Sequence, residues 1–266
     1  MAKRVAVKQA CTVLFDTLPP LDSALLQAVL QPSVGPCSVE WATSSGPDIP
    51  VLAGVAEFPP HRIAMIALKA PVKREVLDRT VAVSPMPGDL REGLMAHRAT
   101  VRLLYVGDAE EPVAQLTALY RVATALVAQG GLGVLNERAA LAQPAELVAS
   151  YLPQLGSEVP PLGLWVGAVT FNLGEGAGDD YLMRTYGMEQ FSLPELGLYL
   201  RDSSTADTSY HILLNVCLYM VEGRGKLQMG AGNTVEFNKR TYLFTLPEET
   251  SPEFSSPSGL FLLREV

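Results

Sequence analysis

The sequence predicts an α+β fold in which antiparallel sheets carry helices on one face. Short runs of alternating apolar residues are typical of strands, and longer runs with apolar residues at helical spacing lie between them. The order strand, helix, glycine turn, strand occurs around 100–136 and again around 196–245. Hydrophobic residues make up 48% of the 266 residues and charged residues 18%, which is enough apolar material for a sizeable core.

Residues 1–95 predict a strand–helix–strand–strand unit followed by a short charged helix. Pro32 and the Gly35–Pro36 pair are expected to stop the first helix, because proline cannot continue the backbone hydrogen bonding. The expected elements are strands over 10–15, 37–42 and 63–68, and helices over 21–30 and 73–79.

Residues 96–250 repeat this alternation. Pro112 suits the first position of a helix, and Gly130–Gly131 is a typical helix stop. The expected elements are strands over 100–106, 132–135, 196–200, 234–237 and 242–245, and helices over 112–129, 144–152 and 209–222.

The division of the chain follows from these elements. We expect two ferredoxin-like halves, over 1–95 and 96–250, and a Ser- and Pro-rich tail over 251–266. Within the tail, Leu260–Leu263 is apolar enough to dock as a short strand. Whether the two halves form one compact domain with a shared sheet stays open.

Charge and cysteine content exclude several classes of function. The net charge is −8, from 28 acidic and 20 scattered basic residues, so we expect no nucleic-acid partner and no membrane partner. The odd number of cysteines, three, suits a reducing compartment better than a disulfide framework. The longest apolar run, 212–221, is too short to cross a membrane. The sequence therefore predicts a cytoplasmic protein.

Motifs for metals and cofactors are lacking. His61, His97 and His211 do not lie at ligand spacing on one predicted element. The segment Gly223-x-Gly225-Lys226 lacks both the earlier glycine and the following Ser or Thr of a phosphate-binding loop. The acidic stretch 174–180 lacks the alternating spacing of a calcium loop, so we interpret it as a hairpin tip. The sequence predicts no cofactor and no metal.

Polar side chains that could form a binding site concentrate in two places. Arg184, Tyr186 and Glu195 lie close in sequence, and a carboxylate beside an arginine can do acid–base work if the two converge in a cleft. His211 and Asn215 share one stripe of an otherwise apolar helix. For both groups the alternative is structural: a turn with a surface ion pair for the first, and the solvent-facing side of the helix for the second.

Four stretches carry a resemblance to a known family: HRIAMIALKAPVKREVL, HRATVRLLYVG, GLGVL and YLMRTYGMEQFSLPELGLYL. The clearest contains Thr185-x-Gly187-x-x-x-Phe191-x-Leu193-Pro194-Glu195-Leu196. In these stretches the chain resembles the bacterial family of uncharacterised proteins named domain of unknown function 4261, and the resemblance covers roughly residues 10 to 250. The resemblance implies a soluble bacterial α+β protein, and it implies no activity and no site residues.

Two hypotheses about function follow. The first is a non-catalytic module that binds another protein or assembles with itself, and the sequence favours it because no catalytic arrangement is present. The second is an enzyme or small-molecule-binding protein with a site around 184–215. A flat surface with an apolar patch or an unpaired sheet edge favours the first, and a deep pocket lined by the polar residues favours the second.

Overall fold

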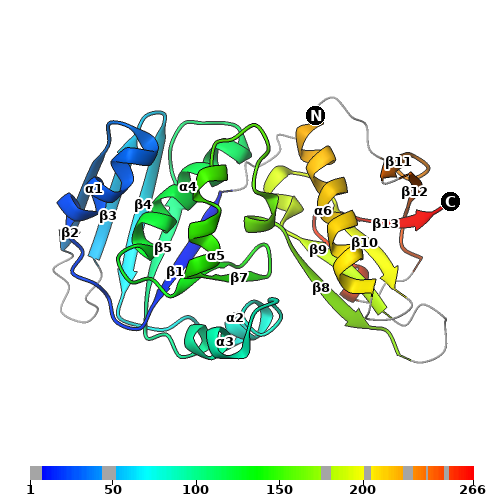
Figure 1. Ribbon diagram of the computed structural model, residues 1–266, viewed down its shortest axis with the longest axis horizontal. Coiled ribbons are helices and arrows are strands. Elements are labelled where there is room, and N and C mark those ends of the chain that lie inside the picture. The colour runs from blue at the N-terminus through cyan, green and yellow to red at the C-terminus, as the bar shows by residue number, and fades with distance from the viewer. Residues whose placement is uncertain are drawn as a thin grey trace. The chain divides into compact units, whose positions relative to one another are not determined.

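The computed structural model describes residues 8–43, 52–174, 181–200, 205–223, 230–237, 239–248 and 252–266 (Figure 1). The chain divides into two compact units, Met1–Leu164 and Trp165–Val266. Each contains a sheet whose strands are mostly antiparallel, with helices packed on it, so the α+β class predicted from the sequence is confirmed. Most of the acidic stretch 174–180, together with Gly225 and Lys226, lies outside the described residues.

In the described residues, unit 1 forms a seven-stranded sheet with the order β2-β3-β4-β5-β1-β6-β7. Every neighbouring pair is antiparallel. The run β4-β5-β1-β6 has the split β-α-β order of a ferredoxin-like fold, and β2 and β3 extend it on the β4 side. The strands are β1 (Ala10–Phe15), β2 (Ser38–Thr43), β3 (Leu52–Phe58), β4 (His61–Leu68), β5 (Ala99–Tyr105), β6 (Gly133–Asn136) and β7 (Leu141–Pro144).

One face of this sheet is covered by α1 (Ser23–Val34) and α4 (Pro112–Val127), which lie side by side in Figure 1. Because side chains alternate along a strand, Val13, Met65 and Leu103 point to this face, and all three are fully buried. This helical face holds the main core of unit 1. The short helix α5 (Ala145–Ser150) packs against α4 and is followed by η1 (Leu152–Gln154) and η2 (Leu162–Leu164).

The opposite face of the sheet, here called the outer face, is covered in part by α2 (Arg74–Arg79) and α3 (Gly88–Met95). Leu77 and Leu94 from this pair pack against Leu14, Leu135 and Ala142, which belong to β1, β6 and β7. Helices therefore lie on both faces of this sheet, where the sequence predicted one. The helix over 73–79 was expected, but α3 was not, because Pro85 and Pro87 directly before it were interpreted as an interruption of regular structure.

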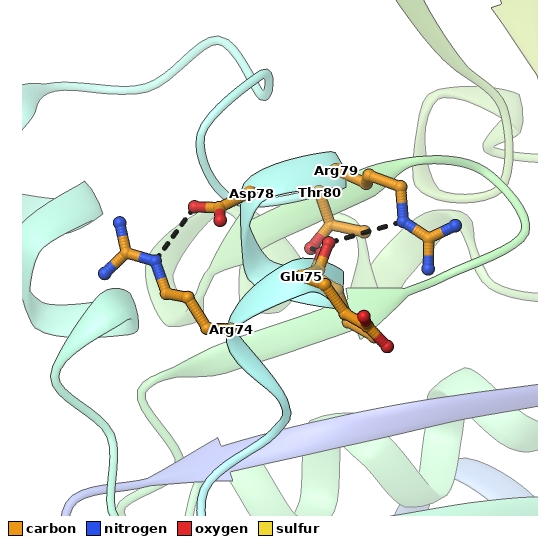
Figure 2. A network of polar contacts seen from close by, with 6 residues as sticks. Arg74, Glu75, Asp78, Arg79 and Thr80 are labelled. Carbon is orange, nitrogen blue, oxygen red and sulfur yellow. Dashed lines mark hydrogen bonds and ion pairs between the residues drawn. The ribbon is translucent and has the colours of Figure 1, made fainter.

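Polar side chains of the short helix α2 make contacts along the helix that support it (Figure 2). Arg74 Nε lies 2.9 Å from Asp78 Oδ1 across one turn, and the Thr80 hydroxyl donates to the carbonyl of Val76 at 2.7 Å. The ion pair is exposed, so it contributes about 0.3–0.5 kcal/mol. Packing of Leu77 on the sheet is the larger stabilising contribution.

The division of the chain differs from the one expected between residues 95 and 96. In the structure β5 pairs with β4 on one side and with β1 on the other. A boundary at residue 95 would cut this sheet in two, so the two units meet instead after Leu164. The segment before this boundary contains Gly156 and the pair Pro160–Pro161, which the sequence reasoning did not interpret as a domain boundary.

Unit 2 forms a six-stranded sheet, in the part that the structure describes, with the order β11-β12-β13-β10-β9-β8. The central pair β10–β13 is parallel, so this sheet lacks the split β-α-β order that the sequence predicted for the second half. The helix α6 (Ala206–Glu222) packs against β9 and β10. The strands are β8 (Gly167–Asn172), β9 (Tyr181–Tyr186), β10 (Glu195–Leu200), β11 (Thr234–Phe237), β12 (Arg240–Thr245) and β13 (Leu260–Glu265).

Two short 3-10 helices belong to the described part of unit 2. η3 (Met188–Phe191) connects β9 to β10, and η5 (Pro252–Phe254) covers one face of the sheet, where Phe254 packs against Leu182, Leu260 and Leu262. The tail is thus partly ordered, and its last strand, β13, fills the centre of the sheet between β12 and β10.

Candidate functional site

The connection from β9 to β10 contains the first group of candidate residues. Gly187 follows β9 with φ +111°, a left-handed conformation that favours glycine, and the chain then makes the single turn of η3. The carboxylate of Glu195, at the start of β10, accepts hydrogen bonds from the amides of Gly187 and Met188, both at 3.0 Å. It also accepts one from the Thr185 hydroxyl at 2.8 Å. Glu195 therefore holds the N-terminal end of η3.

Burial controls the electrostatics of Glu195, whose side chain is only 3% exposed. Burial raises the pKa of this carboxyl from its ordinary value of 4.5 to about 7. The hydrogen bonds from Thr185 and from the backbone, and the charge of Arg184, act in the opposite direction. Such a pKa is suited to proton transfer near neutral pH. Both oxygens of this carboxyl nevertheless accept hydrogen bonds from groups of its own chain, and burial keeps the carboxyl away from solvent.

Arg184 is buried on the face of the sheet that η5 covers. Its Nη1 donates to the carbonyl of Glu253 at 2.8 Å, and its guanidinium lies 4.6 Å from the centre of the Tyr186 ring. The Nε–H is buried and has no hydrogen-bond partner among the described residues. Tyr186 is half-buried, and burial raises the pKa of its hydroxyl. Arg184 thus connects β9 to η5 by a hydrogen bond, and its guanidinium stacks on the Tyr186 ring.

The second group of candidates does not join the first. His211 and Asn215 are exposed on α6, and the Asn215 amide donates to the His211 carbonyl of the same helix at 2.7 Å. The buried side of α6, with Cys217, faces the sheet. The structure therefore brings Arg184, Tyr186 and Glu195 together around one connection, but it leaves His211 and Asn215 on the solvent side of the helix.

The other histidines have partners that account for them. His97 is buried; its Nε2 accepts from the amide of Val72 at 2.9 Å, and its Nδ1 lies 2.7 Å from the carbonyl of Leu94. This pattern requires a neutral ring with the proton on Nδ1, and burial accordingly lowers the pKa of His97. His61 Nδ1 lies 3.0 Å from the Tyr105 hydroxyl. Within the described ranges, no three His, Cys, Asp or Glu side chains could hold a metal ion.

Titration of Glu195 gives a testable pH dependence. Between its unfolded value of 4.5 and its native pKa of about 7 the folded chain binds more protons than the unfolded chain. This contribution to stability is therefore fully present below the unfolded value and falls as pH rises through the native pKa, by up to about 1.4 kcal/mol per pH unit. We expect Glu195→Gln, which cannot titrate, to gain stability relative to wild type by about 2–3 kcal/mol from about pH 5 to about pH 8.

Urea unfolding of both proteins across this range measures the difference directly, since all other titrating groups are shared. A constant difference in unfolding free energy would show that the Glu195 carboxyl keeps its ordinary pKa.

Comparisons with known proteins add no assignment: no family model, no curated protein and no solved structure matches the chain. The resemblance to the family named domain of unknown function 4261 therefore stays a prediction. No described helix is long and apolar enough to cross a membrane. The function has to be argued from the surfaces of the chain itself.

Two surfaces of unit 1 were missed by the sequence reasoning. One is the half-buried apolar row on the outer face of β4, which alternates with the core row of the same strand. The other surrounds Arg121, the single charged residue in the sixteen residues of α4. Both signals were present in the sequence: an uninterrupted apolar run over Ile63–Leu68, and an isolated cation within an apolar helix.

Proposed function

We propose that this chain is a non-catalytic assembly module that pairs with a second copy of itself through the outer face of the unit 1 sheet. The observation that carries the proposal is an apolar patch on β3, β4 and β5, here called the open patch. Its side chains remain half-buried in the single chain, whereas Ile63, Met65 and Ala67 on the helical face of β4 are fully buried. The open patch consists of Val55, Ala64, Ile66, Leu68 and Leu104.

The register of the strands places the open patch on one continuous surface. Ala64 lies opposite Val55 on β3 and opposite Leu104 on β5, and Ile66 and Leu68 follow along β4. α2 and α3 pack on the β1, β6 and β7 side of the same face. Apolar side chains gathered on a flat sheet face favour contact with another protein surface.

Charges around the open patch favour a second copy as the partner. Arg62 and Glu57 form an ion pair of 2.8 Å, and Arg102 and Glu40 are exposed on the same face. Two basic and two acidic side chains balance locally in a chain of net charge −8. A two-fold axis can set arginines of one copy against glutamates of the other, since such an interface uses the same patch on both subunits.

The free edge of β2 also favours assembly. In the described part of the chain this strand pairs with β3 alone and contains neither proline nor lysine, which commonly protect sheet edges. The edge at β7 differs, because the Ala142 amide there donates to the Ser84 hydroxyl at 2.8 Å and the strand ends in Pro144.

The alternative of a catalytic or ligand site around 184–215 has weaker support. Arg184 and Glu195 direct their hydrogen bonds to backbone groups of their own unit, and His211 and Asn215 lie on the exposed side of α6. The raised pKa of Glu195 is the observation that favours a reacting group at this place, but the carboxyl is buried and its oxygens accept hydrogen bonds from its own unit.

Ile66→Glu tests the proposal, because it places a charge at the centre of the open patch. We expect sedimentation velocity to show a dimer for the wild-type chain at several hundred micromolar and a monomer for Ile66→Glu at the same concentration. Burying an unpaired carboxylate in a dimer interface is expected to weaken association at least a hundredfold, or about 2.7 kcal/mol or more.

Leu25→Glu is the matched control, since Leu25 is an exposed leucine of α1 on the opposite side of the sheet. It should leave the dimer intact. A wild-type chain that stays monomeric at the highest concentration, or an equal effect of both substitutions, would refute the assembly proposal.

A further inference from the structure

A groove runs between α1, α4 and η1 on the helical face of unit 1. Its volume is about 400 Å³, which lies within the usual range for ligand pockets. The wall is mostly apolar, with three polar residues among its members. The lining residues are Val29, Pro32 and Ser33 from α1, Arg121, Thr124, Ala125 and Ala128 from α4 and its C-terminal end, and Leu152 and Pro153 from η1.

Arg121 is held in a defined position at this groove. Its Nη2 donates to the carbonyl of Leu155 at 2.9 Å. The next residue, Gly156, has φ +95°, and a Cβ atom there would come within 2.6 Å of the same Nη2. The turn at 155–156 therefore uses a glycine both for its left-handed backbone and to leave room for the guanidinium. This arrangement fixes the cation before any ligand arrives.

Arg121 has no carboxylate partner in the part of the chain that the structure describes. No carboxylate among the described residues lies within ion-pair distance of its guanidinium. Burial lowers the pKa of Arg121, so this cation is partly desolvated. The pKa of His61 is lowered by burial first and then by the positive charge of Arg121. An anionic group placed beside Arg121 would relieve this cost.

The two hydroxyl groups of the groove already donate hydrogen bonds within their own helices, so they do not compete with Arg121 for an anion. The Ser33 hydroxyl donates to the carbonyl of Leu30 at 2.8 Å, and the Thr124 hydroxyl donates to the carbonyl of Tyr120 at 2.7 Å. Their protons are engaged in these bonds within the helices, so the guanidinium is the donor available to a ligand.

We propose that this groove binds a small amphipathic carboxylate, with its apolar body against Val29, Ala125 and Leu152 and its carboxylate on Arg121. A mostly apolar wall with one fixed cation matches a ligand that carries one anionic group on a hydrocarbon body. The groove lies on the face of the sheet opposite the open patch, so the proposal is independent of self-association and each can fail alone.

Octanoate is the probe, and octylammonium is its matched control because the two share a tail and differ in the sign of their charge. By isothermal titration calorimetry we expect saturable one-to-one binding of octanoate to the wild-type chain. Octylammonium should bind at least about tenfold more weakly, since its ammonium would face the guanidinium. Equal binding of both probes, or no saturable binding of octanoate at millimolar concentration, would overturn the proposal.

Two variants separate the charge from the apolar wall. Arg121→Gln removes the charge and keeps an uncharged polar side chain, and it should lower octanoate affinity about tenfold or more. Ala128→Phe places a ring in the groove from an exposed position, so it should fold normally and block octanoate. Circular dichroism checks that both variants are folded. Unchanged octanoate affinity in either folded variant would place binding elsewhere and overturn the proposal.

Discussion

Glu195→Ala is expected to lower the free energy of unfolding by about 3–5 kcal/mol at pH 6. The substitution leaves the buried amides of Gly187 and Met188 and the Thr185 hydroxyl without their acceptor. Each buried donor that loses its partner costs about 1–3 kcal/mol, and the N-terminal end of η3 loses the carboxyl group that accepts its hydrogen bonds. Urea unfolding followed by circular dichroism measures the loss.

Glu248→Ala serves as the control in the same unit. The Glu248 side chain is 87% exposed, and its ion pair with Arg264 is long, at 3.9 Å. It should change stability by less than about 0.5 kcal/mol. If Glu195→Ala were as stable as this control, the hydrogen bonds around η3 would contribute nothing measurable, and the structural role of Glu195 would be wrong.

Arg184→Ala is expected to destabilise the chain by about 2–4 kcal/mol. It removes the donor to the Glu253 carbonyl, the stacking on Tyr186 and the buried aliphatic part of the side chain. Because Arg184 joins η5 to β9, we also expect faster hydrogen exchange of the amides around 252–255 than in the wild-type chain.

Arg240→Ala is the comparison for this loss, since Arg240 makes an exposed ion pair with Glu265 on the same sheet. Its effect should stay below about 1 kcal/mol. Equal destabilisation by the two substitutions, or unchanged exchange at η5, would contradict the anchoring role of Arg184.

Elements with strong local signals were predictable from the sequence. The strand over 10–15 and the strand over 234–237 have the observed bounds, and the helix begins at Pro112 as expected. Pro112 suits a first helical position, so the start of α4 is determined locally. Pro32 misled the prediction for α1, because the helix continues to Val34 with the proline inside its last turn.

Elements that depend on distant partners were not predictable. β3 contains Gly54, whose absent side chain makes room for the Trp41 ring on β2; a Cβ there would lie 2.5 Å from that ring. A glycine inside a short run weakens the local strand signal, and the reason for it appears only when β2 is paired beside it. The absence of a boundary at residue 95 is equally non-local, since it follows from the pairing of β5 with β1.

The candidate site was predictable as a cluster but not in its role. Proximity in sequence across a hairpin brought Arg184, Tyr186 and Glu195 together correctly. Which way each side chain points depends on strand alternation and on η5, some 70 residues further along the chain. Adding His211 and Asn215 to the site required α6 to turn its polar stripe toward the sheet, but the apolar stripe faces the sheet instead.

The cluster around Glu195 stabilises unit 2, and we propose that the open patch of unit 1 makes contact with a second copy. Sedimentation velocity of wild type, Glu195→Gln and Ile66→Glu over one concentration series tests this most directly. We predict that wild type and Glu195→Gln form dimers with the same affinity and that Ile66→Glu remains monomeric. Loss of the dimer in Glu195→Gln together with an unaffected Ile66→Glu would contradict the claim.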